Sequence, residues 1–106
     1  MRVPRGILSI SVRIRDRRYT IRFMPARSMN KDWGRCYFPP GRHPLIEVRR
    51  TLTGRNMIDT IAHEVLHACQ PDMSEQGVEE TAGAIARALY AAGCRMTRNL
   101  NTKEKP

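Results

Sequence analysis

Apolar and polar residues alternate along the first part of the chain. Between residues 8 and 14 every second residue is leucine, isoleucine or valine, and the residues between them are serine or arginine. After a charged turn at Asp16-Arg17-Arg18, Tyr19, Ile21 and Phe23 repeat this alternation. A period of two is typical of strands with one buried face, so the pattern predicts an antiparallel hairpin.

Two shorter apolar runs follow, and they predict two more strands. Residues 33–38 form the first and stop at Pro39-Pro40-Gly41, and residues 45–49 form the second. The segment from Arg27 to Lys31 reads as a connection. All predicted strands therefore lie within residues 7–50.

After residue 54 the apolar residues no longer alternate but recur every three or four residues, as they do along one face of a helix. A first helix is predicted over residues 55–69, with Thr53 or Asn56 as its cap, and a second over residues 75–93, with Ser74 as its N-cap. The apolar residues of the first helix are Ile58, Ile61, Ala62, Val65 and Leu66. In the second helix the expected buried face consists of Val78, Ala82, Ile85 and Leu89. Strands followed by helices predict an α+β fold with a small, largely antiparallel sheet.

The chain is long enough for one domain, which we place at residues 1–98. Residues 99–106 are mostly polar and are expected to form a flexible tail.

The first predicted helix carries the sequence His63-Glu64-Val65-Leu66-His67, which matches the HExxH pattern of zinc-dependent peptidases. Positions i and i+4 share one helix face, so both imidazoles can reach one metal ion. Glu64 can lie beside a metal-bound water as general base. No other charged residue occurs between Thr60 and Gln70, as a buried catalytic helix requires.

A third protein ligand is expected, because catalytic zinc sites usually use three and leave one position to water. Glu79 borders the expected buried face of the second helix, and we predict it as this ligand. Glu75 also lies near that face, but in the first turn, where a capping or dipole role is the simpler explanation. Glu80 points away, and a surface charge explains it better. The choice among the three remains open at this point.

The segment from Thr60 to Gly93 resembles the small metallopeptidases of bacteriophages and prophages. These share an acidic helix of the form V-E-E-T-A after H-E-x-x-H-A and a short loop. More distantly the segment is similar to gluzincin-type proteins, including the ImmA/IrrE class, which use two histidines and a glutamate. SprT-like peptidases are also similar, but they take a third histidine, and no histidine follows His67 in this chain. The resemblance implies a minimal zincin-like domain and, for a phage-encoded protein, a location in the bacterial host cytoplasm.

The function we expect is that of a zinc metalloendopeptidase with one Zn²⁺ per chain, held by His63, His67 and Glu79. Glu64 would take the proton of the metal-activated water and pass it to the leaving amine of a protein or peptide substrate. The resemblance further implies that an edge strand lies along the cleft, and residues 45–49 are the candidate edge. Tyr37, Tyr90 and His43 are candidates for assisting the oxyanion, and the sequence does not choose among them. Trp33 is expected in the core.

Charge suggests an alternative. Residues 1–55 hold 14 Lys/Arg and three Asp/Glu, a net charge of +11, whereas residues 56–106 have a net charge of −2. Such asymmetry is typical of surfaces that meet nucleic acid. The alternative function is therefore a basic nucleic-acid-binding phage or prophage protein whose metal site is structural or regulatory. A purely structural site, however, has no need of a base at Glu64.

The three cysteines, Cys36, Cys69 and Cys94, are widely spaced and predict reduced thiols rather than a disulfide framework. Cys36 is expected to be a buried structural residue, with a soft metal ligand as its alternative role. No apolar run reaches the length of a membrane span, and the basic start of the chain lacks the apolar stretch of a signal peptide. We therefore expect a cytoplasmic protein that does not contact a membrane. The sequence leaves the oligomeric state open.

Overall fold

The computed structural model describes residues 8–37 and 44–96. Phe38, the predicted stop at Pro39-Pro40-Gly41, His43 and the expected tail at 99–106 lie outside the described residues.

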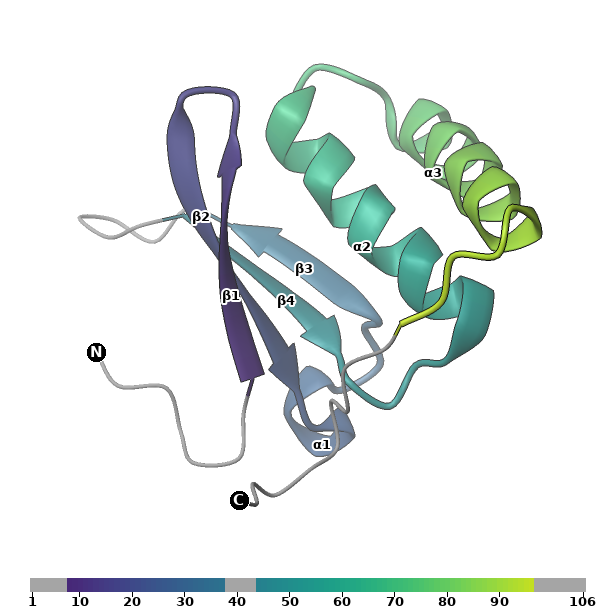
Figure 1. Ribbon diagram of the computed structural model, residues 1–106. Coiled ribbons are helices and arrows are strands. Elements are labelled where there is room, and N and C mark those ends of the chain that lie inside the picture. Colours follow the sequence, from purple (N-terminus) through teal and green to yellow (C-terminus); the bar gives the residue numbers. More distant parts are fainter. Residues whose placement is uncertain (1–7, 38–43, 97–106) are drawn as a thin grey trace.

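Four strands form one sheet in the order β1-β2-β4-β3 (Figure 1). Strands β1 (Leu8–Ile14) and β2 (Arg17–Met24) form the predicted antiparallel hairpin. Strands β3 (Gly34–Tyr37) and β4 (Leu45–Arg49) are also antiparallel, while β4 runs parallel to β2. The predicted α+β class with a largely antiparallel sheet is confirmed.

Strand β4 is an interior strand, and the prediction that it forms an edge is wrong. Ile46 pairs with Ile21 of β2 on one side and with Cys36 of β3 on the other. Residues 45–48 are all buried, as expected of a strand with neighbours on both sides. The edge strand next to the helices is β3.

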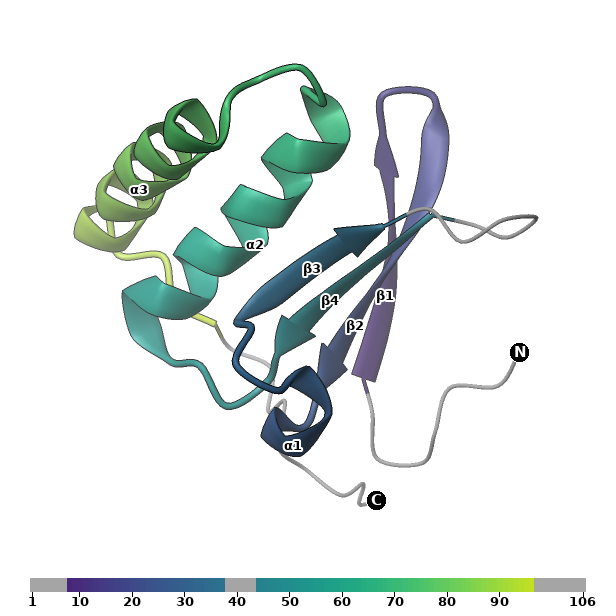
Figure 2. The same cartoon turned by 180° about the vertical axis from the view of Figure 1, so that it is seen from behind.

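Two helices follow the strands and pack against one another as a helical hairpin. Helix α2 (Gly54–Cys69) lies between β3 and α3 (Glu75–Ala91), and Figure 2 shows the same order from behind. The main core lies between the sheet and α2. Its buried residues include Tyr19, Phe23, Ile46 and Met57. None of the described helices is both long enough and apolar enough to cross a membrane.

A short helix, α1 (Ala26–Met29), occupies the segment that the sequence predicts as a connection. Arginine side chains fix the chain between α1 and β3. Arg35 donates to the Met29 carbonyl over 2.9 Å, and Arg49 donates to the Asn30 carbonyl over 2.7 Å. The backbone N–H of Arg49 also donates to the Trp33 carbonyl over 2.8 Å. These bonds hold the start of β3 in place beside α2.

The prediction of the buried face of α3 is confirmed for Val78 and Ala82 and wrong for Ile85 and Leu89. Val78, Ala82 and Ala86 are fully buried, whereas Ile85 and Leu89 are 39% and 41% exposed. The packed face therefore follows Val78, Ala82 and Ala86 at intervals of four residues. The predicted N-cap is confirmed, since the Ser74 hydroxyl accepts a hydrogen bond from the Gly77 N–H over 3.0 Å. Thr53 is the N-cap of α2 by position but makes no side-chain capping bond.

Candidate metal centre

The two histidines of the HExxH sequence converge on one face of α2. Their Nε2 atoms lie 3.2 Å apart, and the rings meet edge to face with centroids 4.8 Å apart. His63 and His67 are partly exposed, at 21% and 30% of their side-chain surface. Both rings are thus partly open to solvent.

A carboxylate from α3 completes this cluster. Glu75 Oε2 lies 3.2 Å from His63 Nε2, and Glu75 Oε1 lies 3.1 Å from His67 Nε2. Among the described residues, His63, His67 and Glu75 are the group whose donor atoms come within 4.8 Å of one another. Zn–N distances of about 2.0–2.1 Å and tetrahedral angles place two ligand atoms about 3.3 Å apart. The donor set and its spacing therefore fit a zinc ion.

Hydrogen bonding alone explains these contacts poorly. A neutral histidine carries one N–H, so the two Nε2 atoms can supply at most two hydrogens. The three short contacts of the cluster would need three. If both rings donate a hydrogen bond to Glu75, both Nε2 atoms carry a hydrogen and lie 3.2 Å apart, and two donors cannot bond to one another. A shared cation would satisfy all three contacts at once.

Glu79, the predicted third ligand, is not part of this group. Ala82 lies in the middle of the buried face of α3. At about 100° per residue, the direction of Glu75 around the helix axis differs from that of Ala82 by about 20°, and the direction of Glu79 differs from it by about 60°. The first turn of α3 directly follows the short loop from α2, so Glu75 also lies close to the last turn of that helix, which carries His67. The structure thus brings Glu75, and not Glu79, next to both histidines. Glu80 lies elsewhere, and its carboxylate accepts a hydrogen bond from Gln76.

The Glu64 side chain points toward β3 and is buried. An ideal Cβ on Gly34 would lie 2.8 Å from Glu64 Cγ, so the edge strand passes directly over this carboxylate. Burial raises the pKa of Glu64 to about 7, with smaller contributions from Glu75 and Asp32, and His63 opposes the rise. A carboxyl group with this pKa can take up and release a proton near neutral pH.

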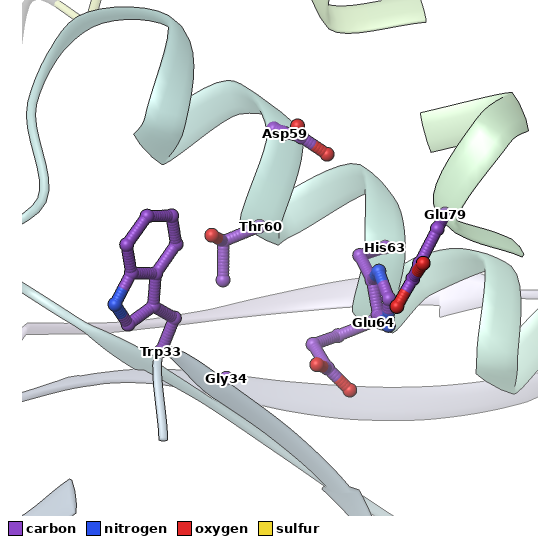
Figure 3. A pocket seen from close by; sticks show the side chains of 7 residues that line it. All are labelled: Trp33, Gly34, Asp59, Thr60, His63, Glu64 and Glu79. Atoms are coloured by element: carbon purple, nitrogen blue, oxygen red, sulfur yellow. The ribbon is translucent and has the colours of Figure 1, made fainter. Parts of the chain in front are cut away.

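A cavity of about 320 Å³ lies next to the histidines (Figure 3). Its walls come from β3, α2 and α3. The residues that line it are Trp33, Gly34, Asp59, Thr60, His63, Glu64 and Glu79. The predicted site residues His63, Glu64 and Glu79 therefore share one cavity.

Three residues of the cavity, Gly34, Asp59 and Thr60, are not among those predicted from the sequence. Asp59 and Thr60 lie one helical turn before His63 and Glu64, a spacing that could have identified them. Trp33 is 50% exposed and lines the cavity, so its expected place in the core is wrong. No signal in the sequence places Gly34 over Glu64, because that contact depends on how β3 packs against α2.

The remaining candidates do not line the cavity. Burial raises the pKa of the Tyr37 hydroxyl group, and the nearby Glu47 carboxylate adds to the rise. Tyr90 lies near Gly54, at the N-terminal end of α2, and stacks under the Arg95 guanidinium. His43 lies outside the described residues.

Cys36 packs against the main core. Burial and the nearby Glu64 raise the pKa of its thiol to about 11. This residue belongs to the core side of β3, in agreement with a structural role.

Comparisons of the chain with protein-family models, with curated proteins and with solved structures found no match. The assignment of a function therefore depends on the geometry of the site.

Proposed function

We propose that this chain is a zinc-dependent metallopeptidase in which His63, His67 and Glu75 hold the metal. The observation that carries the proposal is the triangle of two imidazole nitrogens and one carboxylate, with contacts of 3.1–3.2 Å, next to a buried glutamate. Imidazole and carboxylate ligands suit zinc and also other first-row metals.

When bound at such a site, zinc lowers the pKa of a water molecule to about 7 and polarises a carbonyl group. Glu64 is the general base of the proposed reaction. Its carboxylate faces the cavity beside His63, accepts the proton of the attacking water and returns it to the leaving amine. The burial that raises its pKa matches this task, because the proton must be both gained and lost near neutral pH.

The edge position of β3 supports a peptide as substrate. An exposed sheet edge can pair with extended peptide backbone through main-chain hydrogen bonds. Strand β3 is an edge of the sheet, and Gly34 and Trp33 at its start line the cavity. A bound peptide would pass from this edge over Glu64 and the histidines. We also propose a cytoplasmic location, because the reducing cytoplasm keeps thiols free and the three cysteines of this chain are unpaired.

Metal content and peptide cleavage test the proposal together. We expect about one zinc per chain by mass spectrometry, lost in His67→Ala and kept in Glu64→Gln. Cleavage of casein or of a mixed peptide library should depend on zinc and disappear in Glu64→Gln. Glu80→Gln is the matched control and should retain both properties, since Glu80 bonds to Gln76 outside the cluster. A wild-type protein that binds no transition metal would contradict the proposal.

The second candidate, nucleic-acid binding, draws support from the β1–β2 hairpin. Arg13, Arg15, Arg17 and Arg18 are all exposed there. Arg35 and Arg49, in contrast, are engaged by carboxylates and backbone carbonyls within the protein. Binding to DNA that weakens steeply with salt, and that persists after zinc removal, would favour this candidate.

A further inference from the structure

The cavity beside the histidines has an acidic lining. Three carboxylate residues, Asp59, Glu64 and Glu79, contribute to its walls, although the chain holds only ten acidic residues and has a net charge of +9. The cavity is therefore a local exception to the basic character of the protein. Its occupant should be one that negative charge attracts.

The arrangement of these carboxylates does not suit a second metal ion. Among the described residues, Asp59, Glu64 and Glu79 do not form a group whose oxygens converge on one point. They are instead spread along the cavity, with Asp59 and Glu64 on successive turns of α2 and Glu79 on α3 (Figure 3). Such spacing fits a longer cationic group with several hydrogen-bond donors.

The hydrogen bonding of Glu64, one of these three residues, gives further support for a ligand. Its side chain is more than nine-tenths buried and faces the cavity. No hydrogen bond joins its carboxylate to any other group in the described part of the chain. Because the cavity is the open side of this carboxylate, water or a ligand in the cavity would supply its hydrogen-bond donor.

Trp33 supplies an aromatic wall. Its indole is half exposed and lies across the cavity from α2 in Figure 3, while its backbone carbonyl is bonded to Arg49. A guanidinium or ammonium group near an indole face gains a cation–π interaction. The volume of about 320 Å³ is at the low end for ligand pockets and suits one long side chain.

We propose that this cavity binds the side chain of an arginine or lysine residue in a peptide, close to the bond that the metal centre cleaves. The inference rests on the proposed peptidase function for its biological meaning. The binding itself depends only on Trp33, Asp59, Glu64 and Glu79. Asp59 and Glu79 pair with the cationic end, and the aliphatic stem lies against Trp33.

Trp33 also provides the measurement, because it is the only tryptophan of the chain. The full-length protein, with and without one equivalent of zinc, is titrated with acetyl-Gly-Arg-Gly-amide and acetyl-Gly-citrulline-Gly-amide while tryptophan fluorescence is followed. Citrulline retains the shape of arginine but lacks its charge. At physiological salt the Debye length is about 8 Å, so the distant positive charges interfere little. We expect the arginine peptide to bind at least about tenfold more tightly.

Two variants and one control test whether the preference for the arginine peptide depends on the cavity. Asp59→Asn and Glu79→Gln should each reduce the preference for arginine to less than about threefold. Glu79 is exposed, so its variant should fold even if replacement of the half-buried Asp59 disturbs α2. Asp16→Asn removes the same charge at the β1–β2 turn, outside the cavity, and should keep the preference.

Equal affinity for the two peptides, absence of any fluorescence change, or a preference that persists in both variants would overturn the inference. The proposed function can fail separately. Selective binding of the arginine peptide by a protein that cleaves no library peptide would support the cavity assignment and contradict the peptidase. Zinc-dependent cleavage without enrichment of arginine or lysine near the cut bond would support the peptidase function and contradict the cavity assignment.

Discussion

Gly34 on β3 and Glu64 on α2 are so close that no side chain fits between them. A Cβ atom on residue 34 would lie 2.8 Å from Glu64 Cγ and 2.9 Å from Glu64 Oε2. It would also lie 2.8 Å from Thr60 Cγ2. The absence of a side chain at this position allows the edge strand to cover the proposed general base.

Gly34→Ala should therefore destabilise the protein and disturb Glu64. Both neighbours are buried on a helix, so they have little room to move, and overpacking of this kind costs about 1–3 kcal/mol. Urea unfolding measures the loss of stability, and zinc titration should show that the histidines still bind the metal.

Gly83→Ala is the control. Its Cβ would meet only the end of the flexible Arg87 side chain, and alanine in a helix interior should stabilise by about 0.5–1 kcal/mol. A Gly34→Ala protein as stable as wild type would show that β3 is less tightly packed.

The two glutamates of α3 can be separated by their effect on zinc affinity. Glu75→Gln should weaken zinc binding by at least about 100-fold, because even residues that only support a metal ligand contribute about 10–100-fold. Glu79→Gln should have a much smaller effect, since Glu79 is outside the group of converging donors. Competition with a coloured chelator measures both affinities. The opposite order would restore Glu79 as the third ligand.

The histidine positions could be predicted from the sequence because they depend on one helix alone. The i, i+4 spacing of His63 and His67 fixes their common face as soon as α2 forms. The same holds for Ser74, whose capping bond is made within its own turn. Contacts inside one element are determined by local residues.

The glutamate that approaches the histidines and the residues of the cavity could not be predicted in this way. Whether Glu75 or Glu79 meets the histidines depends on the rotation of α3 against α2. That rotation follows from the small residues Ala82 and Ala86 rather than from the larger Ile85 and Leu89. The place of Trp33 likewise depends on strand order, since β3 is an edge and β4 is not.

Cys36 should be nearly unreactive in the folded protein. With a pKa raised to about 11 by burial, only about one thiol in a thousand is ionised at pH 8. The exposed Cys94 should react with iodoacetamide first, as measured by mass spectrometry of the digested protein. Cys36→Ser should keep full zinc binding, because Cys36 is not among the converging donors. Loss of zinc in this variant would instead identify the thiol as a ligand.

The raised pKa of Glu64 predicts how the stability of the metal-free protein depends on pH. The folded-state pKa of about 7 exceeds the ordinary value of 4.5, so folding favours the protonated carboxyl group. The resulting stabilisation is complete below about pH 4.5 and is lost as the pH rises to about 7. Glutamine cannot ionise, so Glu64→Gln should be more stable than wild type at pH 8, by up to about 3 kcal/mol. This advantage should shrink steadily toward pH 4.

Urea unfolding in the presence of a chelator measures the difference in stability between Glu64→Gln and wild type at each pH. Glu80→Gln, an exposed change on α3, is the control for replacing a glutamate by glutamine away from β3. A difference for Glu64→Gln that stays constant with pH would mean that water reaches the carboxylate, and that β3 does not shield the proposed base.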